Sequence, residues 1–236
     1  MTEAEWLTSE DPGAMLKDWP WAVSERKARL FACACCRRIW SLLPAPESRR
    51  AVEVSEKLAD GRARDGSRAK AHDAATQVAR RVRAYAEASA EAVSGRLLRS
   101  YRKTAAVMEW ASRTAYYAHE AAYTGAYHAA GTADRAAFDS GNRTKDAERA
   151  AQAALVRDIF SNPYRPVVLD SSWLTTDVLL LARSIYEEKA FDRMPILADA
   201  LQDAGCTNDA VPNHCRDAKQ VHVRGCWVVD LLLGKG

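Results

Sequence analysis

The sequence has little from which a β-sheet could be built. Only two short segments, RPVVLD (165–170) and KQVHVRG (219–225), carry β-branched residues close together, and both are brief. Glycine is scarce, with 11 residues that fall mainly at the ends of predicted helices. Nearly every other segment places its apolar residues at the 3.6-residue spacing of a helix. The fold class is therefore predicted to be all-α.

Long apolar runs are also absent. No stretch of about 18 apolar residues, the length needed to cross a bilayer, occurs in the 236 residues. The segment MTEAEWLTSEDPGAM at the amino end is acidic and does not resemble a secretory signal. The six cysteines belong to a chain long enough to build a core without disulfides. We therefore expect a cytoplasmic protein with free thiols and no membrane partner.

Catalytic signatures are missing as well. The chain contains no GKS or GKT phosphate loop, no GxSxG turn and no HExxH motif. A cysteine nucleophile beside a histidine base stays open as an alternative, because such partners meet only in the folded chain. The net charge of +3 is too small to require a nucleic-acid partner for the chain as a whole. The sequence thus predicts a non-catalytic protein without a cofactor, zinc excepted as discussed below.

What the chain does contain is helical patterning in three blocks. Residues 1–65 read as an N-terminal helical block, with a capping box at Thr2 and Glu5 and a helix-opening Pro46. Ser24 is predicted to cap a longer helix over roughly 25–43, which Pro44 ends. Residues 144–236 read as a C-terminal helical block that includes helices over 145–160 and from about Thr176. We expect these two blocks to pack together as one globular body.

The middle block, residues 66–143, is rich in alanine, which has the highest intrinsic helix propensity. Two seams of small and apolar residues in steps of three and four run through it and are offset at Ser94-Gly95. This pattern favours a long antiparallel helical pair that turns at Ser94-Gly95. A single kinked helix is the alternative.

Three segments at the two ends carry a resemblance. They are RKARLFACACCRRIWSLL (26–43), ERAAQAALVRDIFSNPYRPVVLD (148–170), and LADALQDAGC with HVRGCWVVDLLLGK (197–206 and 222–235). Together they resemble a set of paralogous planctomycete proteins in which the same ends flank an alanine-rich middle of variable length. The set has no known activity, so the resemblance implies one cytoplasmic family and a tolerant middle, and assigns no catalytic residue.

Cysteine and histidine gather near the carboxyl end. The group comprises Cys206, His214, Cys215, His222 and Cys226. Zinc prefers four thiolate or imidazole ligands in a tetrahedron. Cys206, Cys215, His222 and Cys226 supply such atoms within 21 residues, although their spacing matches no common zinc module. No CxxC pair is present, so buried core cysteines with exposed histidines are the competing interpretation. Cys33 and Cys36 share a helix face and can also ligate metal, although thiols that fill tight helix contacts explain them equally well.

Basic residues concentrate between residues 62 and 103, where 11 Lys and Arg face 4 Asp and Glu. The candidate nucleic-acid contacts are Arg80, Arg81, Arg83, Arg96, Arg99, Arg102 and Lys103. Such a cluster can neutralise phosphates and release counterions on binding. The alternative is a solvated face that keeps an alanine-rich helix soluble.

Tyrosines form a second stripe. Tyr116, Tyr123 and Tyr127 recur at helical spacing, with His119 alongside. Tyrosine offers a large contact area with a polar tip, which suits a protein interface. Packing against the rest of the chain is the alternative. The leading hypothesis is therefore a non-catalytic helical interaction module, an adaptor or subunit of a larger assembly; nucleic-acid binding and a zinc-stabilised module are the second and third.

Overall fold

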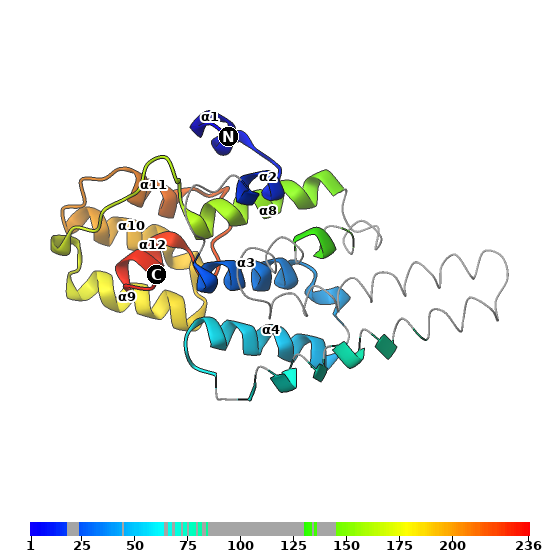
Figure 1. The fold of residues 1–236 in the computed structure, drawn as a ribbon. Coiled ribbons are helices and arrows are strands. Elements are labelled where there is room, and N and C mark those ends of the chain that lie inside the picture. Colours follow the sequence, from blue (N-terminus) through cyan, green and yellow to red (C-terminus); the bar gives the residue numbers. More distant parts are fainter. Residues whose placement is uncertain are drawn as a thin grey trace. The chain divides into compact units, whose positions relative to one another are not determined.

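The computed structural model describes residues 1–17, 24–43, 45–63, 130–133, 135 and 145–236, together with parts of 66–84. Every regular element in this part of the chain is a helix, and it contains no strand, which confirms the all-α fold class (Figure 1). The chain divides into two compact units. The N-terminal unit is Ser9–Ala153, and the C-terminal unit joins Met1–Thr8 to Ala154–Gly236.

The predicted division into three blocks stays a prediction. It concerns how 1–65 and 144–236 pack against each other, and the two compact units divide the chain at other points. The predicted long helical pair falls almost entirely outside the described residues. Within those residues, no helix is both long enough and apolar enough to span a bilayer.

Two packed helices form the centre of the N-terminal unit. The described elements are α2 (Pro12–Lys17), α3 (Glu25–Arg38), the 3-10 turn η1 (Trp40–Leu42) and α4 (Pro46–Ala59). The Ser24 hydroxyl accepts a hydrogen bond from the Lys27 backbone N–H and so caps α3, as predicted. Helices α3 and α4 pack together and bury an apolar core.

One ion pair in this unit is deeply buried. Arg38 on α3 donates to both carboxylate oxygens of Glu148 at 2.8 and 3.0 Å, and the Glu148 side chain has no exposed surface. Glu148 belongs to the first turns of α8 (Lys145–Phe160), a helix that begins in the N-terminal unit and ends in the C-terminal one. The Gln152 amide donates to the same carboxylate and to the Ala130 carbonyl, so the buried charge has several partners.

The C-terminal unit is built from short helices. They are α1 (Glu3–Thr8), the end of α8, η2 (Ser171–Trp173), α9 (Thr176–Glu188), η3 (Phe191–Arg193), α10 (Met194–Asp203), α11 (Ala210–Arg216) and α12 (Trp227–Leu232). The predicted capping box of α1 is confirmed, because Thr2 and Glu5 exchange backbone-to-side-chain hydrogen bonds. The predicted helices over 145–160 and from Thr176 are confirmed too.

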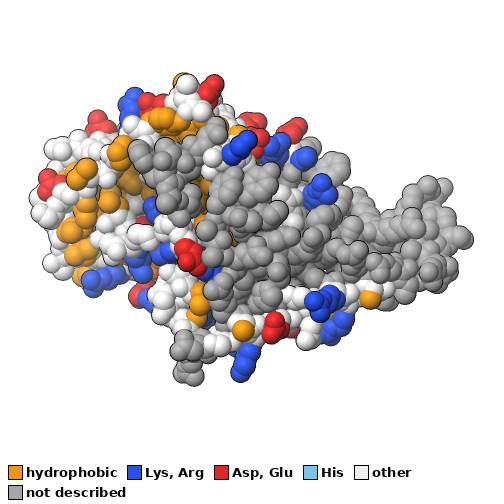
Figure 2. Space-filling model, viewed as in Figure 1, with side chains coloured by type: hydrophobic (Ala, Val, Ile, Leu, Met, Phe, Trp, Pro, Cys, Tyr) orange, Lys and Arg blue, Asp and Glu red, His pale blue; other side chains and the backbone are white. Residues whose placement is uncertain are grey.

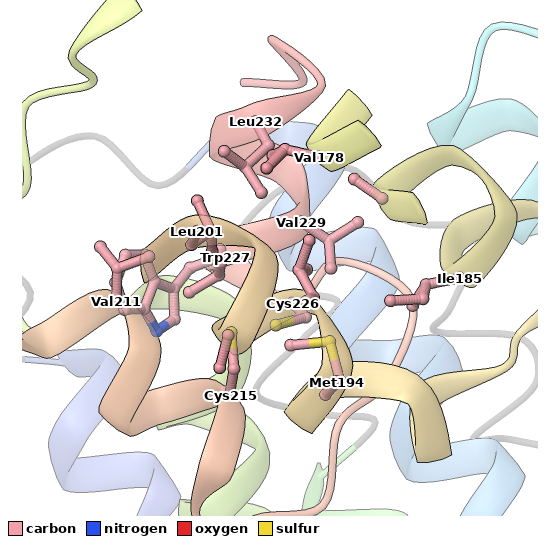
Figure 3. Close-up of a cluster of buried hydrophobic side chains, with 14 of the residues drawn as sticks. Val178, Ile185, Met194, Leu201, Val211, Cys215, Cys226, Trp227, Val229 and Leu232 are labelled. Carbon is pink, nitrogen blue, oxygen red and sulfur yellow. The ribbon is translucent and has the colours of Figure 1, made fainter. Parts of the chain in front are cut away.

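One apolar cluster holds α9 to α12 together. Figure 3 shows Val178 and Ile185 from α9, Met194 from α10, Cys215 from α11 and Val229 from α12 pointing toward one another. All five side chains are at most 2% exposed. Because each of these helices is only two to four turns long, its stability depends on burying this face rather than on helix propensity. The cluster therefore fixes the ends of α11 and α12, which carry the site described next.

Candidate metal centre

Four side chains with metal-binding atoms converge in the C-terminal unit. They are Asp158 on α8, His214 on α11, His222 in the loop that follows, and Cys226 at the N-cap of α12. One ligand atom from each residue lies within 4.8 Å of the corresponding atom of every other. Helix α8 and the segment 214–226, which begins 56 residues after Asp158, thus contribute to a single point.

Asp158 anchors the group from the buried face of α8. It lies three residues after Leu155 and directly before Ile159, which are 1% and 0% exposed, and it is itself 0% exposed. Its Oδ2 accepts a hydrogen bond from the Val223 backbone N–H at 2.9 Å. This contact fixes the carboxylate and leaves Oδ1 facing the two histidines.

Four of the six spacings between the donor atoms resemble those of a tetrahedral site. Asp158 Oδ1 lies 3.1 Å from His214 Nε2 and 2.8 Å from His222 Nδ1. Cys226 Sγ lies 3.4 Å from the same His214 atom and 3.8 Å from the same His222 atom. Zinc with bonds of about 2.0–2.1 Å to nitrogen and oxygen and about 2.3 Å to sulfur spaces its tetrahedral ligands about 3.3–3.6 Å apart, and the four distances fall within about 0.5 Å of that range. Every pair of donor atoms in the group lies within 4.8 Å, so one ion bound to all four requires local adjustment of the side chains.

A cluster held by hydrogen bonds alone would make strong use of only some of these contacts. Each facing imidazole nitrogen can carry a single proton, yet each faces both the Asp158 oxygen and the Cys226 sulfur. In a purely hydrogen-bonded cluster, the contacts of the Cys226 sulfur with the two imidazole nitrogens are therefore not needed for hydrogen bonding. A central cation uses all four atoms at once, because each then directs a lone pair at the metal.

Burial makes the charge balance of the site important. Asp158 and Cys226 are 0% exposed, and the His214 and His222 side chains are 12% and 7% exposed. A buried carboxylate and thiolate are costly unless they are paired or bind a metal. With one divalent cation and two neutral imidazoles, the four-ligand site is electrically neutral. The donor set of one sulfur, two nitrogens and one oxygen also matches the preference of zinc for borderline ligands.

The same environment shifts the pKa of the two acidic ligands. Burial acts to raise the pKa of Asp158, but hydrogen bonds from His214 and His222 and the nearby imidazole charges outweigh it, and the pKa lies below its usual value. Burial, followed by the negative charge of Asp158, raises the pKa of the Cys226 thiol well above its usual value. The metal-free thiol is therefore protonated at neutral pH, and a metal must displace its proton.

Ring contacts hold the two imidazoles in place. The His214 and His222 rings meet edge to face with centroids 4.9 Å apart, and the Trp227 ring lies 5.0 Å from His214. His222 Nε2 is buried and has no hydrogen-bond partner within the described residues. His222 is thus held by polar contacts through Nδ1, the atom that faces the other ligands.

The structure brings together part of the predicted zinc set. His222 and Cys226 lie in the cluster, whereas Cys206 and Cys215 are not among the four converging residues. Cys215 is 2% exposed in the apolar core, where burial raises its pKa to about 12, and the Cys206 thiol is directed at the Asn208 carbonyl at 3.7 Å. His214 and Asp158 complete the cluster in their place.

The described residues include only part of the other predicted sites. Arg80 and Arg81 are described and exposed. The remaining members of the arginine cluster, Arg83, Arg96, Arg99, Arg102 and Lys103, and the tyrosine stripe of Tyr116, His119, Tyr123 and Tyr127 lie outside the described residues. Cys33 and Cys36 are at most 2% exposed within the N-terminal core, and all six cysteines are free thiols.

Comparison with known proteins adds nothing to this geometry. No protein-family model, curated protein or solved structure matches the chain. The resemblance to the planctomycete set therefore stays a prediction, and the case for function depends on the site itself.

Proposed function

We propose that this protein is a zinc-stabilised, non-catalytic helical module in which one ion ties α8, α11 and α12 together. The observation that carries this proposal is the convergence of Asp158, His214, His222 and Cys226 within 4.8 Å. The proposal retains the interaction module expected from the sequence. Its zinc ligands differ from the set predicted from the sequence.

Four protein ligands favour a structural role for the ion. Structural zinc sites are filled by four side chains, whereas catalytic sites use three and leave a position for water or substrate. Both acidic ligands of this cluster are fully buried and both histidine side chains are nearly so. A site of this kind stabilises the fold and has no open position for a substrate, which fits a non-catalytic adaptor or assembly subunit.

A second interpretation of these residues, as the catalytic group of a cysteine protease, is less well supported. Cys226, His214 and Asp158 do lie in contact, as in a nucleophile, base and orienting acid. A reactive cysteine, however, needs a lowered pKa and access to substrate. Cys226 has a raised pKa and no exposed surface, so the geometry supports ligation rather than attack.

Metal analysis of the purified full-length protein tests the proposal. After expression with zinc and purification without chelator, we expect about one equivalent of zinc per chain. His214→Ala and Cys226→Ala should each reduce this to less than about a tenth of an equivalent, because three remaining ligands bind zinc far more weakly. Cys206→Ala removes a nearby thiol outside the cluster and should keep the full equivalent.

The wild-type measurement decides the matter even if a ligand variant fails to fold. Wild-type protein that holds less than about a tenth of an equivalent, both as purified and after incubation with zinc followed by desalting, would refute the zinc site. Equal zinc loss in Cys206→Ala and Cys226→Ala would refute the assignment of ligands.

A further inference from the structure

A second chemical feature lies in the N-terminal unit, between α4 and the helical segment that begins at Ser67. A cavity of about 600 Å³ is lined there by Glu47, Arg50, Val54, Lys57, Arg62, Ala63, Ser67, Lys70, Ala71 and Ala74. Of the five charged residues in this described lining, four are basic and one is acidic. We propose that this groove binds the phosphate backbone of a single-stranded nucleic acid.

The lining residues come from two helix faces directed at each other. On α4, Arg50 and Lys57 are seven residues apart and share one face with Val54. Across the groove, Lys70 and Ala74 share a face of the second helical segment. The small alanines leave room between the helices, and the longer basic side chains line the space.

Three basic residues of the groove differ from several other arginines that the structure describes in this unit. Four of those arginines are paired with carboxylates: Arg29 with Glu25, Arg37 with Glu56, Arg38 with Glu148, and Arg149 with Asp11. Arg50, Lys57 and Lys70 form no ion pair with any residue that the structure describes. All three are exposed, so their charges are available to an anion. Figure 2 shows blue basic side chains on the surface of this region.

The spacing of the charges favours a chain of phosphates over a single one. Seven residues of helix separate Arg50 from Lys57 by about 10.5 Å along the axis, so the positive charges are spread along the groove rather than gathered at one point. A strand that carries a phosphate at every nucleotide can contact both basic residues and Lys70 together. Arg81, which is exposed and follows Ala74 at a helical spacing of seven, lies further along the same segment.

Salt dependence gives the test. The probe is a fluorescein-labelled single-stranded oligothymidylate, and its affinity for full-length protein is measured by anisotropy at several salt concentrations. Four phosphate contacts predict a slope of about −3 for log affinity against log salt, a roughly 50-fold loss of affinity between about 50 and about 200 mM. The variant Arg50→Gln/Lys57→Gln/Lys70→Gln should have a slope of about −0.7, because one basic residue remains.

A matched variant controls for general charge. Lys17→Gln/Arg183→Gln/Lys219→Gln removes three exposed positive charges that do not line the groove, and it should keep the wild-type slope. The replaced groove residues are exposed, so both triple variants should give the circular dichroism spectrum of the wild type. The single variant Lys57→Gln should reduce the slope by about 0.7 and provides a second measurement.

Three results would overturn the proposal. They are absence of binding at low salt, equal weakening by the groove variant and the control variant, and equally effective competition by polyglutamate, which would show that any polyanion suffices. Because the groove contains none of the four metal ligands, its test can fail while the zinc proposal holds, and the reverse is also true.

Discussion

Removal of the proposed zinc ion is expected to lower the thermal unfolding midpoint of the C-terminal unit by about 15–30 °C. A ligand that binds only the folded state at about 1,000 times its Kd contributes roughly 4 kcal/mol. In a domain of about 60–100 residues, each kcal/mol shifts the midpoint by about 4–8 °C. The loss follows from the geometry, because without the ion Asp158 is buried beside a protonated thiol and two imidazoles that share one acceptor oxygen.

Hydrogen exchange localises this effect. After treatment with a chelator and desalting, peptides that cover α11 and α12 should exchange faster, and added zinc should restore their protection. Peptides that cover α3 and α4 in the N-terminal unit serve as the control within the same molecule. Unchanged exchange in α11 and α12, together with an unchanged midpoint, would show that the cluster is an ordinary hydrogen-bonded contact.

Glu148→Ala is expected to destabilise the N-terminal unit by about 3–5 kcal/mol. The substitution leaves the Arg38 guanidinium, which is only 18% exposed, without its bidentate partner. It also removes an acceptor from the Gln152 amide. Denaturant unfolding followed by circular dichroism measures the change.

Two further variants make this result specific. Arg149→Ala breaks the pair with Asp11 in the same unit, but the two side chains are 36% and 46% exposed, so the cost should be at most about 1 kcal/mol. The double variant Arg38→Met/Glu148→Met should recover most of the lost stability, because two apolar side chains replace two buried charges. Equal costs for Glu148→Ala and Arg149→Ala would contradict a buried role for the Arg38–Glu148 pair.

Local rules predicted the helices well. Ser24, the Thr2 and Glu5 pair, and Pro46 each mark a helix start in the structure, because capping depends on neighbouring residues alone. The predicted end of the helix that begins after Ser24 was less accurate. The α-helix stops at Arg38 and a 3-10 turn follows, whereas the sequence predicted helix as far as about residue 43. Helix ends depend on tertiary packing more than starts do, and this one precedes Pro44.

The two segments with β-branched residues form no strand. Residues 165–170 and 219–225 are irregular, since neither has a second extended segment to pair with. Polar groups of the second segment, residues 219–225, instead form hydrogen bonds with α8. The Gln220 amide donates to the Ala154 carbonyl, and the Val223 N–H donates to Asp158. This contact brings His222 to the metal cluster.

The candidate site was only half predictable. His222 and Cys226 are four residues apart and belonged to the predicted zinc set, while Asp158 is 56 residues before His214 and came together with it only on folding. The sequence feature that could have identified Asp158 is an acidic residue on the helix face that also carries Leu155 and Ile159. The choice between His214 and Cys215 could not be made, because neighbours on a helix point about 100° apart. Cys215 packs into the apolar core, so His214 is the one of these two neighbours that lies in the site.

Cobalt substitution tests the central claim, that one metal ion is held by a thiolate and three lighter ligands. Metal-free protein titrated with Co²⁺ should develop intense visible bands of a tetrahedral site and a near-ultraviolet band from the bond between sulfur and cobalt, saturating at about one equivalent. Cys226→Ser should lose the near-ultraviolet band, and Cys206→Ser should keep it. A weak octahedral spectrum, or a sulfur band that survives in Cys226→Ser, would contradict the assignment of this site.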